Sequence, residues 1–155
     1  AEEVVLQLKS QGNIVGIISD SYQLVADHIK SKIGADFAIA NRLEYFEGKV
    51  TGEVIIPSWF YKNLESPCSH DLCKTNALLH LSKRYDIPVE NCICIGDSEN
   101  DLCMIQQSGM GVAFCTSDEN LLFHADMVIS TPSFLPLLDT NSFKKINNKQ
   151  PDFMQ

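Results

Sequence analysis

The sequence predicts an α/β fold in which a parallel β-sheet lies between two layers of helices. Short apolar runs rich in β-branched residues alternate along the chain with segments of helical period. Two of these runs end directly in small polar or acidic residues, at Ser19 and at Asp97. Because the strands of a parallel sheet end at a common edge, the alternation predicts that such residues meet at one ligand-binding edge.

The length and charge of the chain restrict its class. Its 155 residues suffice for a core domain over residues 1–140, and the polar, unpatterned residues 141–155 predict a flexible tail. A net charge of −8 argues against nucleic acid as a partner. No apolar run approaches the roughly 18 residues that cross a bilayer, and the first residues are acidic. We therefore expect a cytoplasmic protein with no membrane partner, and leave open whether it forms a homo-oligomer.

The first half of the chain predicts alternating helices and strands followed by an irregular segment. In chain order these elements are a helix over 1–11, a strand over 13–18, a helix over 24–33, a strand over 37–40 and a hairpin over 43–54 that turns near 47–49. The sequence favours Ser21 or Asp20 as the cap of the second helix, and the alternative is that a hydroxyl at this turn holds an anion. Together with the hairpin, the irregular residues 55–72 form a predicted flap over 43–72, anchored to the core by its aromatic cluster.

The second half continues the alternation. Its predicted elements are a helix over 75–85, a strand over 92–95, a short helix that starts at Leu102, a strand over 111–114, a helix over 118–124 and a strand over 127–129. Lys74 stands at the start of the first of these helices, where a cation opposes the helix dipole. That placement suggests pairing with an anion, although a surface lysine without a role is an alternative.

Residues 96–101 read Gly-Asp-Ser-Glu-Asn-Asp and follow a buried strand. Their three acidic groups repel one another, so a fold that gathers them beside a strand end normally holds a cation there. Carboxylate oxygens suit Mg²⁺, which we expect as the cofactor. The alternative is an acidic turn that is simply solvated.

Six cysteines raise the question of disulfides or zinc. We expect Cys92, Cys94 and Cys115 to be buried as small hydrophobic residues, because each lies in or after an apolar run. Cys68, His70 and Cys73 could bind a metal, but their spacing matches no common zinc pattern and no second ligand pair follows. The sequence therefore favours reduced thiols without a metal.

Four segments match a known family in order. The second motif of this family is similar to Ile17-Ile18-Ser19, the third motif to Lys74 and the fourth motif to residues 96–101. One branch of the family also has a segment similar to Ala40-Asn41-Arg42-Leu43 followed by Gly48-Lys49-Val50-Thr51-Gly52. The chain thus resembles the haloacid dehalogenase superfamily of phosphatases, most of all the phosphoserine phosphatase branch, from about Val15 to Ile129. The resemblance implies a three-layer, Rossmann-like core.

The resemblance also implies roles for particular residues. Ser19 would hydrogen-bond the transferring phosphoryl group, and Lys74 would neutralise its charge. Asp97 would bind magnesium, and Asp101 would support the metal through water or hold Lys74. Asn100 would orient the phosphate or the second shell of the metal, and Asp20 and Arg42 would lie on the substrate side.

Two departures from the family qualify this expectation. The first motif, Asp-x-Asp-x-Thr/Val, carries the family's nucleophile and is absent from these residues, so we expect a core that is incomplete at its N-terminus and lacks the cap. Asp20 stands where the branch usually has glycine, which argues against serine phosphate as the substrate.

The expected function is therefore the C-terminal part of a magnesium-dependent phosphomonoester hydrolase that acts through an aspartyl phosphate. Its expected substrate is a small phosphorylated metabolite that is similar to phosphoserine. We expect this chain alone to be inactive or nearly so. The alternative is a noncatalytic domain that binds phosphate or metal, or one completed by an N-terminal segment that supplies the missing strand.

Overall fold

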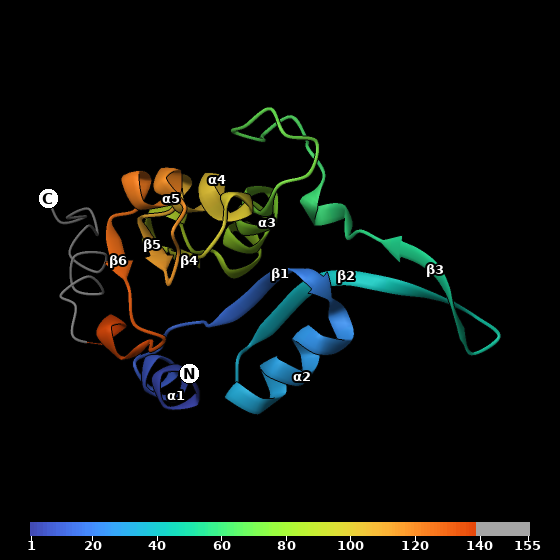
Figure 1. Ribbon diagram of the computed structural model, residues 1–155, viewed down its shortest axis with the longest axis horizontal. Coiled ribbons are helices and arrows are strands. Elements are labelled where there is room, and N and C mark those ends of the chain that lie inside the picture. Colours follow the sequence, from blue (N-terminus) through green and yellow to red (C-terminus); the bar gives the residue numbers. More distant parts are fainter. Residues whose placement is uncertain (139–155) are drawn as a thin grey trace, which may run out of the picture.

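The computed structural model describes residues 1–138 and confirms the mixed α/β fold with parallel strands (Figure 1). The α-helices are α1 (Glu2–Ser10), α2 (Gln23–Ile33), α3 (Lys74–Tyr85), α4 (Leu102–Gln107) and α5 (Glu119–His124). The strands are β1 (Gly16–Tyr22), β2 (Phe37–Phe46), β3 (Lys49–Ile55), β4 (Ile93–Gly96), β5 (Met110–Phe114) and β6 (Met127–Ile129). Short 3₁₀ turns span Ser58–Phe60, Val89–Asn91, Glu99–Asp101 and Leu135–Leu137. The tail predicted over 141–155 lies outside the described residues, and the boundary at residue 140 stays a prediction.

The strands form two three-stranded sheets instead of one continuous sheet. β4, β5 and β6 are parallel in that order. β1 is parallel to β2, and β3 pairs antiparallel with β2. Within residues 1–138, β1 and β4 therefore each have a partner strand on one side only.

Helix α3 joins the two sheets through separate parts of its apolar surface. Ala77 and Leu81 pack with Ile39 of β2, while Leu78 packs with Cys94 of β4. Ile18 of β1 contacts both clusters. Since α2 also contacts β1 and β2, this sheet lies between helices. The packing brings the carboxyl ends of β1 and β4 together.

Strand β1 differs from its predicted bounds in a way that matters for the site. It starts at Gly16 and extends to Tyr22, so Ser19, Asp20 and Ser21 belong to the strand. The register slips between Ile18 and Tyr22, which makes this part a bulge, and Ser19 Oγ accepts a hydrogen bond from Ser21 N–H at 3.1 Å. Tyr22 is the N-cap of α2 and no side chain caps it, so the capping role considered for Ser21 or Asp20 is wrong.

The predicted hairpin is confirmed. Its turn contains Glu47 and Gly48, both with positive φ, at 50° and 76°. Two positive φ values are typical of the tight turns that match strand twist. The arm that leads into the turn is longer than expected, because the strand predicted over 37–40 continues without a break as β2 to Phe46.

The cysteine predictions have mixed outcomes. Cys94 is buried in the core, which raises the pKa of its thiol to about 12. Cys92 packs against the same cluster but is only half-buried, so its predicted burial holds only in part. Cys115 is exposed, so its predicted burial is wrong. The reason is local: Cys115 follows β5 in a turn with φ of 48°, beyond the last strand residue. In the described part of the chain, no helix has both the length and the apolar character to span a bilayer.

Candidate active site

The amino group of Lys74 connects the carboxyl ends of β1 and β4. Lys74 is the first residue of α3, and its Nζ lies 2.8 Å from Asp101 Oδ1 and 3.1 Å from Asp20 Oδ2. The Asp101 side chain is almost fully buried, while about half of the Asp20 side chain is exposed. The anion partner expected for Lys74 from its position is therefore provided by two carboxylates of the chain itself.

Asp101 is held by donors on both of its oxygens. Oδ2 accepts hydrogen bonds from the backbone N–H groups of Asp97 and Ser98, at 3.0 and 3.3 Å, and from the Ser98 hydroxyl at 3.3 Å. Ser98 and Asp101 together form a capping box for the 3₁₀ turn that follows β4. Gly96 makes this possible, because a Cβ there would stand 2.2 Å from Asp101 Cβ. In this arrangement Asp101 positions Lys74, which is one of the two roles expected for it.

The electrostatics keep Lys74 charged. Burial by itself would lower the pKa of its ammonium group, but Asp101 and Asp20 outweigh that effect and raise the pKa above its usual value. The result is a fixed positive charge at the point where the two sheets approach each other. Two carboxylates already share this charge, so an anion that reaches this point would have to displace the half-exposed Asp20 from it.

A cavity of about 490 Å³ opens beside this charge. Its lining comes from the strand ends, the segment before α3 and the start of α4, and consists of Asp20, Asn41, Ile56, Phe60, His70, Leu72, Cys73, Lys74, Glu99, Asn100, Leu102 and Cys103. Asn100 Nδ2 donates to Asp20 Oδ2 at 3.4 Å, and Asn41 Nδ2 donates to the Asp20 carbonyl at 2.9 Å. Three predicted residues, Asp20, Lys74 and Asn100, thus share one cavity.

Four other predicted residues lie outside the lining, and one of them is the Asp101 described above. Ser19 sits half-buried on the β1 bulge, directly before Asp20. Asp97 is exposed at the end of β4. Arg42 is exposed on β2, where its neighbour Asn41 faces the cavity, and successive strand residues point to opposite faces.

The residues at this edge fit a hard cation such as magnesium. Asp97 offers an exposed carboxylate, the ligand type that Mg²⁺ prefers, and an exposed position leaves room for the water molecules that Mg²⁺ retains. Asp101 fits less well as a direct ligand, because both of its oxygens already accept hydrogen bonds. Asp97 is therefore the residue on which a bound metal would depend most.

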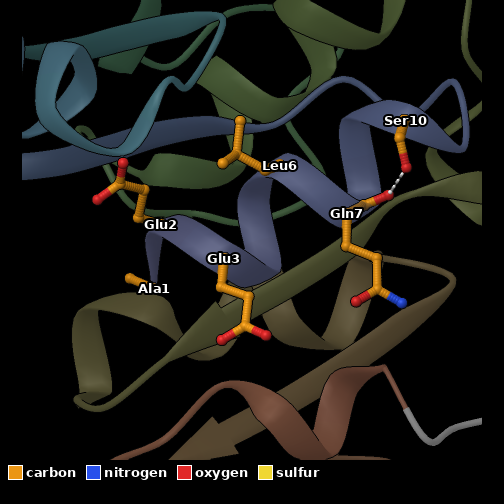
Figure 2. A pocket seen from close by; sticks show the side chains of 6 residues that line it. All are labelled: Ala1, Glu2, Glu3, Leu6, Gln7 and Ser10. Carbon is orange, nitrogen blue, oxygen red and sulfur yellow. Dashed lines mark hydrogen bonds between the residues drawn. The ribbon is translucent and has the colours of Figure 1, made fainter.

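A larger hollow of about 750 Å³ lies far from this chemistry, along α1. Figure 2 shows that its lining comes entirely from the start of the chain and one face of α1, with Glu2 and Glu3 pointing outward. The hydrogen bond drawn there joins Ser10 Oγ to the Gln7 carbonyl of the same helix at 2.7 Å. No pair of functional groups from different elements meets there among the lining residues, so the cavity at Lys74 is the candidate site.

Comparison with known proteins identifies the family. The family model described as haloacid dehalogenase-like hydrolase matches residues 21–133. The chain belongs to the haloacid dehalogenase-like hydrolases. The resemblance seen in the motifs is thereby confirmed.

The relatives of this haloacid dehalogenase-like chain include several phosphoserine phosphatases. It is 33% identical over 115 residues to the phosphoserine phosphatase of Methanocaldococcus jannaschii, covering 74% of this chain and 50% of that protein. It is 31% identical over 137 residues to the one from Archaeoglobus fulgidus, covering 88% and 37%. The chain thus spans half or less of the length of these relatives.

Solved structures agree with the sequence comparison. A crystal structure of phosphoserine phosphatase in apo form superposes with a TM-score of 0.74 at 31% identity, covering 89% of this chain and 64% of that one. A probable phosphoserine phosphatase from Vibrio cholerae, also unliganded, gives a TM-score of 0.74 at 25% identity, covering 95% and 42%. The described residues therefore adopt the fold of this branch of the haloacid dehalogenase-like hydrolases.

The sequence did not reveal every residue of the cavity in this haloacid dehalogenase-like chain. Asn41 was part of a matched segment, yet nothing local indicated that it would hold the Asp20 backbone. His70, Cys73 and Cys103 also line the cavity, and Cys103 comes from a different element than the other two. Its position two residues after Asp101 is the one signal that could have placed it near the site.

Proposed function

We propose that this chain is part of a magnesium-dependent phosphomonoester hydrolase that acts on a small phosphorylated metabolite of the phosphoserine type. The observation that carries the proposal is the buried, permanently charged Lys74 held between Asp101 and Asp20 at the mouth of a cavity. A fixed cation in a partly desolvated place stabilises the charge of a transferring phosphoryl group more strongly than it would in water. The cytoplasm, where such metabolites and reduced thiols occur, is the proposed location.

Each residue has a defined task in this proposal. Lys74 neutralises charge on the phosphoryl oxygens, and Asp101 keeps the ammonium group in place. Ser19, on the bulge at the end of β1, donates its hydroxyl hydrogen to a phosphoryl oxygen. This leaves the Ser19 oxygen free to keep accepting from Ser21 N–H. Asn100 donates from its amide to the substrate when the substrate displaces the long contact to Asp20.

Arg42 and Asp20 have tasks on the substrate side. Asp20 competes with an incoming phosphate for Lys74, because both are anions. Such competition favours a substrate whose other groups can hydrogen-bond a carboxylate. Arg42 is exposed on β2, on the strand face opposite to the cavity-lining Asn41, so any contact with an acidic part of the substrate lies outside the cavity.

Magnesium bound by Asp97, with Asp101 in support, would supply further positive charge to the phosphoryl group. The attacking carboxylate of the proposed reaction belongs to a segment outside these 155 residues. It would form an aspartyl phosphate that water then hydrolyses, so that two easier steps replace one difficult step.

A second candidate is a noncatalytic domain that binds phosphate or metal and is completed by a strand from another segment or chain. It is favoured by the unpaired edges of β1 and β4 among the described residues. Unpaired edges of this kind accept an added strand or associate with other chains. This candidate includes self-association as a homo-oligomer.

Activity and binding measured on the same chain test the main proposal. With magnesium and p-nitrophenyl phosphate, the chain alone should show no turnover above background. It should nevertheless bind inorganic phosphate in calorimetry, and Lys74→Gln should abolish the binding while Lys62→Gln, on the exposed loop before α3, should not. Robust turnover by the chain alone that Asp97→Asn abolishes would contradict the proposal that the attacking carboxylate comes from another segment.

The coding sequence upstream of Ala1 separates the two candidates. An Asp-x-Asp-x-Thr/Val segment after an apolar run would support the hydrolase. A start codon adjacent to Ala1 would instead favour the noncatalytic, partner-dependent domain.

A further inference from the structure

Three thiols and one imidazole converge on the outer side of the cavity. The ligand atoms of Cys68, His70, Cys73 and Cys103 all lie within 4.8 Å of one another. The first three come from the segment that leads into α3, and Cys103 comes from α4. None of the three cysteines is in a disulfide, and His70 is exposed, Cys73 buried and the other two half-buried. Sequence spacing argued against zinc because the fourth ligand comes from a distant element.

The distances suit a tetrahedral metal site. Zinc binds thiolate sulfur at about 2.3 Å and imidazole nitrogen at about 2.0 to 2.1 Å, which gives a sulfur-to-nitrogen edge of about 3.5 to 3.6 Å in a tetrahedron. Cys103 Sγ lies 3.5 Å from His70 Nδ1, which agrees with such an edge. The remaining separations are at most 4.8 Å, so they need to contract by no more than about 1 Å to reach the sulfur-to-sulfur edge of about 3.8 Å in a zinc tetrahedron.

The segment before α3 has few apolar contacts of its own to fix it. Tyr61 and Leu72 pair as an isolated β-bridge, but both are about half exposed, and Leu64 is fully exposed. Between them, the polar contacts include Lys62 N–H to the Asp71 carbonyl and Asn63 N–H to Ser66 Oγ. A metal that joins this segment to α4 would supply a cross-link that apolar burial does not supply here.

We propose that Cys68, His70, Cys73 and Cys103 form a structural, four-coordinate Zn²⁺ site. Three soft thiolates with one imidazole select zinc over magnesium, and four protein ligands close the coordination sphere. On binding, the three thiols release their protons to solvent and the neutral imidazole binds through Nδ1. The Cys73 thiol donates to Thr75 Oγ1 at 3.4 Å, and once this thiol has lost its proton the Thr75 hydroxyl donates to the thiolate instead and orients it.

The position of this zinc site links it to Lys74. Cys73 directly precedes Lys74, and Cys103 stands two residues after Asp101. Bound zinc therefore joins the two elements that carry the Lys74–Asp101 pair and fixes one wall of the cavity. The site shares no ligand with the proposed magnesium site, so zinc binding stands whether or not the phosphatase proposal holds.

Metal binding to the full chain tests the proposal directly. The chain, prepared under reducing conditions and dialysed against Zn²⁺, should retain about one zinc per molecule by mass spectrometry of the metal. Cobalt added to the metal-free chain should show the visible absorption of tetrahedral Co²⁺ and the near-ultraviolet band of thiolate ligation. Cys103→Ser should weaken metal binding at least about tenfold, whereas Cys115→Ser, an exposed thiol outside the cluster, should leave it unchanged.

A second measurement on the unaltered chain avoids dependence on how the variants fold. Zinc should protect Cys68, Cys73 and Cys103 from alkylation by N-ethylmaleimide and leave Cys115 reactive. The proposal is overturned if zinc protects none of the three thiols, or if cobalt binds without thiolate bands. Equal metal affinity of the folded Cys103→Ser and Cys115→Ser chains would overturn it as well.

Discussion

Lys74 Nζ lies 2.8 Å from Asp101 Oδ1, and the two side chains are only 11% and 5% exposed. This pair joins the first residue of α3 to the turn that follows β4. Buried pairs contribute little net stability relative to apolar residues, but breaking one leaves a charge without its partner. The pair therefore makes the geometry of the site and the stability of the fold depend on the same contact.

Lys74→Met should destabilise the chain by about 3 kcal/mol, because it leaves the buried Asp101 carboxylate without a cation. Urea unfolding at neutral pH measures the loss. Lys83→Met is the matched control, since Lys83 pairs with Glu65 on the surface and both side chains are about two-thirds exposed. That variant should lose less than about 1 kcal/mol.

The double variant Lys74→Met with Asp101→Asn should lose less than the sum of the two single losses, because it removes both charges. Strict additivity would show that the two side chains are not coupled. Equal losses for Lys74→Met and Lys83→Met would show that burial of the pair has no energetic consequence.

Local features of the chain were predictable from the sequence. Helix α2 and its end at Gly34 followed from apolar spacing and a glycine with φ of 73°, and the turn at Glu47 and Gly48 followed from its residue types. These features are set by backbone preferences over a few residues, which sequence alone records.

Long-range features were not predictable in the same way. The bulge at Ser19 depends on how β1 pairs with β2, and the partners of Lys74 depend on how two sheets approach each other. Cys103 joins Cys73 only because α4 packs beside α3. Such contacts arise from tertiary packing, so a spacing rule along the chain could not find them.

Asp20→Asn should strengthen the binding of inorganic phosphate in the presence of magnesium by about tenfold, a change of about 1.4 kcal/mol. The reason is that Asp20 lies 3.1 Å from Lys74 Nζ, so its charge opposes an incoming anion. Isothermal titration calorimetry measures the affinity. Glu53→Gln, which removes one exposed charge on β3, is the control and should leave the affinity nearly unchanged. Weaker binding by Asp20→Asn would mean that the carboxylate itself contacts the ligand.

Asp36 makes the stability of the folded chain decrease at acidic pH. Burial by itself would raise the pKa of this carboxyl, but Lys9 Nζ at 2.7 Å and Val15 N–H at 2.8 Å hold its ionised form, and the pKa lies below its usual value. The pKa of an aspartate in the unfolded chain is about 4, and above that pH the lowered pKa of Asp36 in the folded chain stabilises the fold. This stabilisation is lost as the pH falls through the pKa that Asp36 has in the folded chain.

Asp36→Asn should therefore cost about 1 kcal/mol at neutral pH, and the difference from the unaltered chain should shrink below about pH 4. Urea unfolding over a pH series from neutral to acid measures this. Lys9→Met should reduce the pH dependence only in part, because Val15 N–H still holds the carboxylate. If the stability difference between Asp36→Asn and the unaltered chain stays constant across the pH series, the pKa of Asp36 is not lowered in the folded chain.

Gly96→Ala should destabilise the chain by about 2 kcal/mol or more, through crowding at a well-packed position. The added Cβ would stand 2.2 Å from Asp101 Cβ and 2.5 Å from its Cγ, so Asp101 must move and lose donors at Oδ2. Gly34→Ala is the comparison, because nothing lies within 4 Å of its added Cβ and its cost comes only from the positive φ. We expect that cost to be about 1 kcal/mol.

The two glycine variants should also differ in phosphate binding. Gly96→Ala displaces the carboxylate that holds Lys74 and should weaken the affinity for phosphate, measured by calorimetry on the fraction that remains folded. Gly34→Ala lies at the end of α2, away from the lining of the cavity, and should leave that affinity unchanged. If both variants lose stability while both retain full phosphate affinity, the position of Asp101 does not control Lys74.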